Sequence, residues 1–216
     1  AVTRGDGETG DDITRNALKM NGVVRNVDPG FSGGIRGEVV MSRAVLAERF
    51  PDKANCRNAA NGLMKRKDGE GAEFLDVVCY DAVHLSDPSF FPSESAKLDW
   101  LAACGFSVVV SERIRGAEEV VSYRARVMER RPSLPYDIDG LVVKGDEIDL
   151  EDMRRTRPER QIAFKFSLEE AVTTLLDVEW SESGATYTPV GIIEPVRLAG
   201  TTVKRASLSN YGIVRS

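Results

Sequence analysis

The sequence contains no long hydrophobic run. No stretch approaches the roughly 18 to 20 uninterrupted apolar residues that a membrane-spanning helix requires. Residues 1–5 also show no basic segment followed by an apolar core, which is the pattern of a signal peptide. These absences argue against a membrane protein and predict a cytoplasmic location.

Cysteine and histidine are scarce, with three cysteines and one histidine in the chain. Cys56, Cys79 and Cys104 form no C-x-x-C pair, which excludes a zinc knuckle and a disulfide framework. His84 ends an apolar run, so we expect a partly buried structural histidine and not a catalytic one. Any bound metal would be a hard cation held by carboxylates and phosphate oxygens.

The chain has no excess of positive charge. Lys and Arg total 29 against 34 for Asp and Glu, which gives a net charge of −5. A general attraction to nucleic acid is therefore not expected, and any phosphate site must be local.

Apolar periodicity and helix boundaries predict a mixed chain of 216 residues. A helix starting after Ser42 as its N-cap and ending at Pro51 is the clearest of these signals. Residues 55–62 are expected to be a loop. From residue 169 onward helical signals vanish, and the remaining residues are too few for a closed barrel of roughly 70 to 100 residues. The full expectation is helices at 13–20, 43–50, 93–105 and 116–131, and strands at 35–41, 74–85, 106–111, 138–144 and 162–166.

Charged residues mark the ends of several predicted strands: Arg4, Glu38, Asp139, Lys144 and Lys165. A buried strand rarely carries such residues unless the charge is paired or faces a ligand. Two lysines on different strands suit a phosphate group, while the two carboxylates suit ribose hydroxyls or Mg²⁺. The alternative is that these residues are solvent-exposed strand ends.

Five ordered blocks resemble the adenylation domain of the NAD-dependent, bacterial-type DNA ligases. The block at 55–62 is similar to the family's N-P-R-N-A-A-A-G, which ATP-dependent ligases lack, although Cys56 and Asn61 replace Pro and Ala. Residues 188–210 resemble the opening of the family's oligonucleotide-binding barrel. The other blocks are T-R-G-D-G with G-D-D-I-T (3–14), R-G-E-V (36–39), L-P-Y-D-I-D-G-L-V-V-K (134–144) and I-A-F-K-F (162–166).

The resemblance implies a fold and an activity. The fold would be α+β: a nucleotidyltransferase core of antiparallel sheets with flanking helices at 1–168, then an incomplete OB-fold β-barrel at 169–216. The activity would be that of a DNA ligase, which transfers AMP from NAD⁺ to a lysine and then to the 5′-phosphate of nicked duplex DNA, before the 3′-hydroxyl displaces AMP. NAD⁺ and Mg²⁺ would be the cofactors, nicked duplex DNA the partner, and the protein a monomer.

Four site residues would bind the nucleotide by this resemblance. Arg4 would contact the nucleotide, Glu38 the ribose, and Arg57 the nucleotide or DNA phosphates. Tyr80 matches the aromatic residue that stacks on adenine, a contact worth roughly 1 to 3 kcal/mol per base. The alternative for Tyr80 is a core tyrosine on a central strand.

Three further residues would act at the phosphate. Lys144 and Lys165 would hold the α-phosphate and stabilise charge during phosphoryl transfer. Asp139 would support Mg²⁺ or orient Lys144, and Glu38 is the second candidate metal ligand.

The family's nucleophile is a lysine in K-x-D-G, shortly before T-R-G-D-G, and this chain begins close to that block. We expect the attacking lysine to be missing and the 216-residue chain to be inactive by itself, because no other group supplies that amine. Lys67-Asp68-Gly69 has the wrong spacing and is expected to be an exposed turn. Lys65 stands where the family usually has Arg, which affects a bidentate phosphate contact.

Two alternatives remain open at this stage. The chain could be a non-catalytic module that binds a nucleotide or nicked DNA. It could also be an ATP-dependent ligase or capping-type nucleotidyltransferase, which should lack the block at 55–62. If DNA is bound, the basic stretches at 154–160 and 201–216, the latter without a carboxylate side chain, are the candidates for phosphate contacts.

Overall fold

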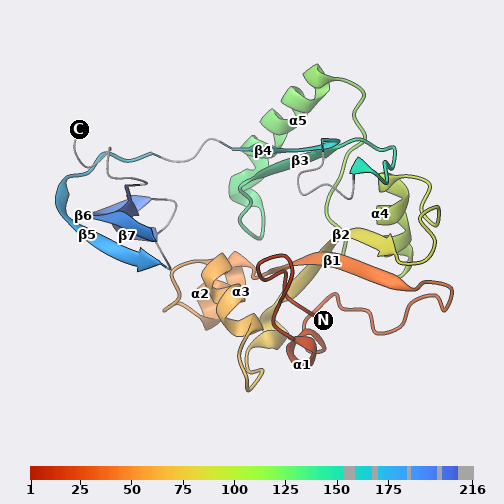
Figure 1. Cartoon of the computed structure of the whole chain (residues 1–216), viewed down its shortest axis with the longest axis horizontal. Coiled ribbons are helices and arrows are strands. Elements are labelled where there is room, and N and C mark those ends of the chain that lie inside the picture. The colour runs from red at the N-terminus through yellow and green to blue at the C-terminus, as the bar shows by residue number, and fades with distance from the viewer. Residues whose placement is uncertain (153–158, 167–169, 184–185, 199–200, 209–216) are drawn as a thin grey trace. The chain divides into compact units, whose positions relative to one another are not determined.

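The computed structural model describes residues 1–152, 159–166, 170–183, 186–198 and 201–208. The chain divides into two compact units, residues 1–166 and 167–216 (Figure 1). Across the described residues, no helix is both long and apolar enough to cross a membrane.

Two small antiparallel sheets organise the first unit. Strands β1 (Gly33–Val40) and β2 (Asp76–His84) form one sheet, and β3 (Gly140–Lys144) and β4 (Gln161–Lys165) form the other. These four strands confirm the predictions at 35–41, 74–85, 138–144 and 162–166.

The predicted strand at 106–111 is wrong. Only Val108 makes a bridge, to Cys79 of β2. Val109 and Val110 are 41% and 78% exposed, because no second layer covers this segment where it leaves the sheet toward the next helix. Valine-rich sequence favours a strand, but a strand also needs a buried face.

The helices of the first unit are α1 (Thr14–Ala17), α2 (Arg43–Arg49), α3 (Cys56–Met64), α4 (Glu94–Ala103) and α5 (Ala117–Arg130), with 3-10 turns at Ala72–Phe74 and Arg131–Ser133. The predicted cap of α2 is confirmed, since Ser42 Oγ accepts a hydrogen bond from Val45 N at 3.2 Å. Helix α1 is shorter than the predicted 13–20, with turns following it.

The segment at 55–62 forms helix α3 and not the predicted loop. Asn55 caps it, accepting a hydrogen bond from Asn58 N at 2.8 Å through its side-chain oxygen. Cys56, Ala59 and Leu63 are buried on one face of the helix. Asparagine and glycine suggest a loop, but burial of this apolar stripe outweighs their low helix propensity.

Two clusters of buried residues hold the first unit together. One joins α3 to the start of β2 and consists of Met20, Met41, Cys56, Ala59, Ala60, Leu63, Ala72 and Leu75. The other joins β2 to α4 and consists of Cys79, Ala82, Phe91 and Leu101, with Phe31, Phe90 and Trp100 packed around it. Strand β2 belongs to both clusters, so its position is fixed along its whole length.

The second unit is a single antiparallel sheet in the described residues, in the order β5 (Leu175–Ser183), β6 (Thr186–Leu198), β7 (Thr201–Ser207). The 201–216 stretch has no carboxylate side chain of its own, but the fold supplies one to Arg205. Arg205 pairs across the sheet with Glu179 at 2.7 Å. The two residues are far apart in sequence and meet only through strand pairing.

Candidate functional site

A β-bulge places Tyr80 on the surface of the β1–β2 sheet. Arg36 pairs with Asp81 and Gly37 pairs with Cys79, so Tyr80 is the extra residue between them. Such a bulge redirects a side chain and bends the strand. At Gly37, a Cβ atom would approach Val77 Cγ1 to 2.9 Å, so glycine permits the close pairing. Tyr80 is 41% exposed, and it is not the core tyrosine that was the alternative.

Two other predicted residues lie near the Tyr80 ring. Burial is the main cause that raises the pKa of Tyr80, and the negative charge of Glu38 raises it further. The positive charges of Arg36 and Arg4 oppose this rise. Arg4, Glu38 and Tyr80 therefore share one electrostatic environment, and we call these three residues the Tyr80 group.

The β3–β4 sheet carries both predicted lysines on one face. Lys165 pairs with Gly140, and Lys144 pairs with Gln161. Because side chains alternate along a strand, Gly140 and Lys144 share a face, and Lys165 shares it too. Four residue steps separate the two lysines along the sheet, which corresponds to about 13 Å. They lie at opposite ends of the same surface.

Helix α5 covers the other face of this sheet (Figure 1). The Arg124 guanidinium lies 4.9 Å from the centre of the Phe164 ring, and that of Arg131 lies 5.4 Å from the Phe166 ring. Cation–π contacts of this kind anchor the helix to β4. The face with Lys144 and Lys165 is therefore the one that α5 leaves open.

Asp139 lies just before β3, at the end of the sheet that carries Lys165. Its carbonyl oxygen accepts a hydrogen bond from Phe166 N at 2.9 Å. Asp139 is therefore beside Lys165, whereas Lys144 lies at the far end of the strand. The structure does not bring Asp139 next to Lys144, contrary to the prediction that it orients that lysine.

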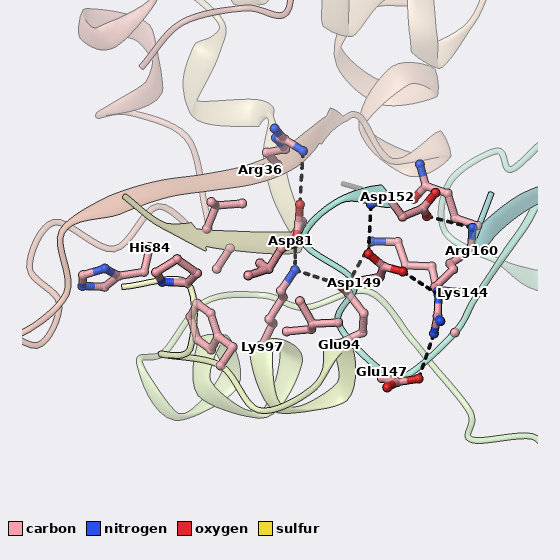
Figure 2. Close-up of a pocket in the computed structure, with 18 of the residues that line it drawn as sticks. Arg36, Asp81, His84, Glu94, Lys97, Lys144, Glu147, Asp149, Asp152 and Arg160 are labelled. Carbon is pink, nitrogen blue, oxygen red and sulfur yellow. Dashed lines mark hydrogen bonds and ion pairs between the residues drawn. The ribbon is translucent and has the colours of Figure 1, made fainter. Parts of the chain in front are cut away.

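A chain of alternating charges connects β1, β2, α4 and β3, and we call it the ion-pair chain (Figure 2). It runs Arg36–Asp81 at 3.3 Å, Asp81–Lys97 at 3.0 Å, Lys97–Glu94 at 2.7 Å and Glu94–Lys144 at 3.4 Å. The side chains of Lys97 and Asp81 are only 3% and 7% exposed. The sequence analysis missed Asp81, Glu94 and Lys97. A carboxylate inside an apolar strand and a lysine on the apolar face of a helix were the available signals.

The ion-pair chain forms one wall of a cavity of about 390 Å³. The segment 145–152, which follows β3, forms the opposite wall together with Arg160 and Gln161. Lys144 is the predicted site residue that lines this cavity. Arg160 is already engaged there, with Glu147 at 2.9 Å and Asp149 at 3.2 Å. Of the predicted basic stretch, residues 153–158 lie outside the described residues.

Arg57 lies near the N-terminus of α3 and is exposed. Helix α3 packs against β1, the strand that carries Glu38. Lys65, at the C-terminal end of the same helix, pairs with Asp11 at 2.7 Å. The lysine thus makes a single ion pair where an arginine could bind bidentately.

Glu38 and Asp139, the two predicted metal ligands, are exposed carboxylates on different sheets. Over the residues that the structure places, no group of three or more His, Cys, Asp or Glu side chains is arranged to hold a metal ion. Mg²⁺ commonly keeps several waters and binds through one or two carboxylates plus substrate phosphates. The exposed carboxylates are compatible with that mode of binding.

Two expectations about local structure are confirmed. His84 is partly buried, accepts a hydrogen bond from Asp87 N at 2.9 Å and stacks on Phe90 with ring centres 4.6 Å apart. Lys67-Asp68-Gly69 is an exposed turn, with Gly69 at φ +66°. Arg66 holds the Asp68 carboxylate and keeps its pKa well below the ordinary value.

Comparison with known proteins gives a family for the chain. The NAD-dependent DNA ligase adenylation domain matches residues 1–169. A DNA ligase of Treponema denticola is 58% identical over the whole chain, which covers 36% of that protein. Those of Treponema pallidum and Bacillus subtilis are 50% and 36% identical over 97% and 99% of the chain, which covers 27% and 34% of them. The chain spans about a third of the length of these relatives, and it belongs to the NAD-dependent DNA ligase adenylation domain family.

Proposed function

We propose that the chain binds NAD⁺ and directs AMP transfer within a DNA ligase that seals nicks in duplex DNA. Residues 1–168 would be its nucleotidyltransferase core, and residues 169–216 the beginning of an OB-fold. The observation that carries the proposal is that Lys144 and Lys165 lie on the same open face of the β3–β4 sheet. Two ammonium groups on one surface suit a phosphate that gains charge during transfer.

The Tyr80 group would bind the nucleoside part of NAD⁺. The exposed ring of Tyr80 offers a surface for stacking on adenine. The Glu38 carboxylate can accept hydrogen bonds from ribose hydroxyls, and Arg4 adds a positive charge beside them. Arg57 would contact the nucleotide or DNA phosphates from α3.

The phosphate part would lie against the two lysines. Lys144 and Lys165 would hold the α-phosphate from opposite ends of the sheet and stabilise its charge. Asp139, beside Lys165, and Glu38 would hold Mg²⁺ together with phosphate oxygens and water. The metal, when bound, would add further stabilisation of negative charge on phosphate.

The attacking amine is supplied elsewhere in this proposal, because the 216 residues contain no K-x-D-G motif. The complete ligase should therefore be labelled by NAD⁺ carrying radioactive phosphate in its AMP half, and should seal a nicked duplex. The 216-residue chain alone should gain no AMP, as measured by mass spectrometry of the denatured protein. Labelling by ATP in place of NAD⁺ would contradict the proposal, and so would stoichiometric labelling of the chain alone.

Replacing Tyr80 by alanine should weaken NAD⁺ binding by about 5- to 150-fold, because a base stacked on an aromatic ring contributes roughly 1 to 3 kcal/mol. Tyr80→Phe should bind NAD⁺ nearly as well as the unchanged enzyme, since it keeps the ring. Titration of the complete ligase with NAD⁺ measures both. Tyr187→Ala removes a tyrosine that is 65% exposed in the second unit and provides the control. Equal affinities for Tyr80→Ala and the unchanged enzyme would place adenine elsewhere.

A further inference from the structure

The lysine at the centre of the ion-pair chain is buried. Lys97 is 2% exposed, and its ammonium contacts Asp81 Oδ1 at 3.0 Å and Glu94 Oε1 at 2.7 Å. A buried ammonium is costly unless it is paired and hydrogen-bonded. Two carboxylates therefore stabilise this cation, and each of them also contacts a second cation, which for Asp81 is Arg36 at 3.3 Å.

Glu94 makes that second interaction with Lys144. One carboxylate oxygen of Glu94 lies 2.7 Å from Lys97 Nζ, and the other lies 3.4 Å from Lys144 Nζ. The contact with the buried lysine is the shorter and the better shielded from water. Glu94 thus contacts both lysines, and its nearer partner is Lys97 (Figure 2).

The backbone fixes the distance between Glu94 and Lys144. Glu94 N donates to the carbonyl oxygen of Asp146 at 2.9 Å, and Ser95 N donates to the Asp146 carboxylate at 2.8 Å. The hydrogen bond from Ser95 N lowers the pKa of the Asp146 carboxyl below its ordinary value. Asp146 follows Lys144 by two residues, so the start of α4 is joined directly to the end of β3.

We propose that Lys97 is a positioning residue for Lys144 and acts through Glu94. By holding Glu94, the buried ammonium limits the attraction of this carboxylate for Lys144, so that Lys144 keeps its charge available to the phosphate of NAD⁺. If Lys97 is removed, Lys144 is left as the cation nearest to Glu94 and is held back from the phosphate. This inference rests on the proposed function, which assigns Lys144 to the phosphate.

The test measures KM for NAD⁺ and kcat of adenylation in the complete ligase. Lys97→Met should raise KM roughly tenfold, as expected for coupled members of one charged network. Glu94→Gln should lower KM by about two- to fivefold, because a partly exposed ion pair of about 0.5 to 1 kcal/mol no longer competes with phosphate. The double variant should return to within about twofold of the unchanged enzyme. An unchanged KM in Lys97→Met, or a double variant no better than Lys97→Met, would overturn the inference.

Folding and specificity need separate controls. Thermal melting shows whether Lys97→Met folds. If it does not fold, Glu94→Gln tests the inference by itself. A KM of Glu94→Gln equal to or above that of the unchanged enzyme would then overturn the inference. Lys53→Met, at an exposed lysine paired with Asp52, should leave KM unchanged. Lys144→Ala distinguishes the two proposals. An unchanged adenylation rate in Lys144→Ala refutes the proposed phosphate site. A slow adenylation rate in Lys144→Ala together with an unchanged KM in Lys97→Met refutes only the role of Lys97.

Discussion

Alanine at Lys144 or at Lys165 should slow adenylation in the complete ligase by about two to three orders of magnitude. Removing one preorganised donor at a developing charge typically costs about 3 to 4 kcal/mol of barrier. Both lysines lie on the open face of the β3–β4 sheet, and Lys144 would lose only its partly exposed ion pair with Glu94, so truncation should change folding stability by about 1 kcal/mol or less. Single-turnover adenylation with saturating NAD⁺ measures the rate, and urea unfolding measures the stability.

Lys53→Ala is the matched control for these variants, because the Lys53 side chain is 46% exposed and follows α2, outside the β3–β4 sheet that carries Lys144 and Lys165. It should leave the adenylation rate and the stability as they are. Rates for Lys144→Ala and Lys165→Ala that match Lys53→Ala would make both residues ordinary surface lysines. The assignment of the phosphate to this face would then be wrong.

Leu101→Ala should lower the free energy of unfolding by about 2 to 5 kcal/mol. Leu101 is fully buried, in the cluster that joins α4 to β2 beside Cys79, Ala82 and Phe91. Its replacement leaves a cavity at the point where α4 is held against the sheet. Urea unfolding of the chain, followed by tryptophan fluorescence and circular dichroism, measures the change.

Leu85→Ala makes the same chemical change at a leucine that is 78% exposed and should cost about 0.5 kcal/mol or less. An equal loss of unfolding free energy in Leu101→Ala and Leu85→Ala would contradict the burial of Leu101 in this cluster. Leu101 also follows Lys97 by one helical turn on α4, so a loosened helix should disturb the ion-pair chain. A loss of NAD⁺ affinity in Leu101→Ala at temperatures where it remains folded would show that coupling.

Local signals were sufficient for much of the fold. The cap at Ser42 and the apolar alternation of β1 depend on residues close in sequence, and both were predicted correctly. Helix α3 was missed because its stability comes from burial against residues such as Met41 and Leu75, which lie far from it in sequence. The prediction for 106–111 failed for the opposite reason, since its strand-like sequence forms only the single bridge between Val108 and Cys79.

The site was predictable only as separate residues. The charged strand ends indicated Glu38, Lys144 and Lys165, but not their grouping on two sheets. The ion-pair chain could not be predicted, because Asp81 and Lys97 meet only when β2 and α4 pack together. A buried charged residue has no local sequence pattern, and its role depends on which opposite charge the fold places beside it.

The extra residue at Tyr80 also sets the phase of strand β2. In a ladder with period two, deleting one residue from this strand would exchange inward and outward side chains on one side of the deletion. Removal of Tyr80 itself is the exception, because Arg36 would still pair with Asp81 and Gly37 with Cys79, so these residues would keep their faces. Elsewhere in Asp76–His84 a single deletion would exchange the two faces, so Tyr80 is the position at which β2 carries one residue more than β1 while both strands keep their faces.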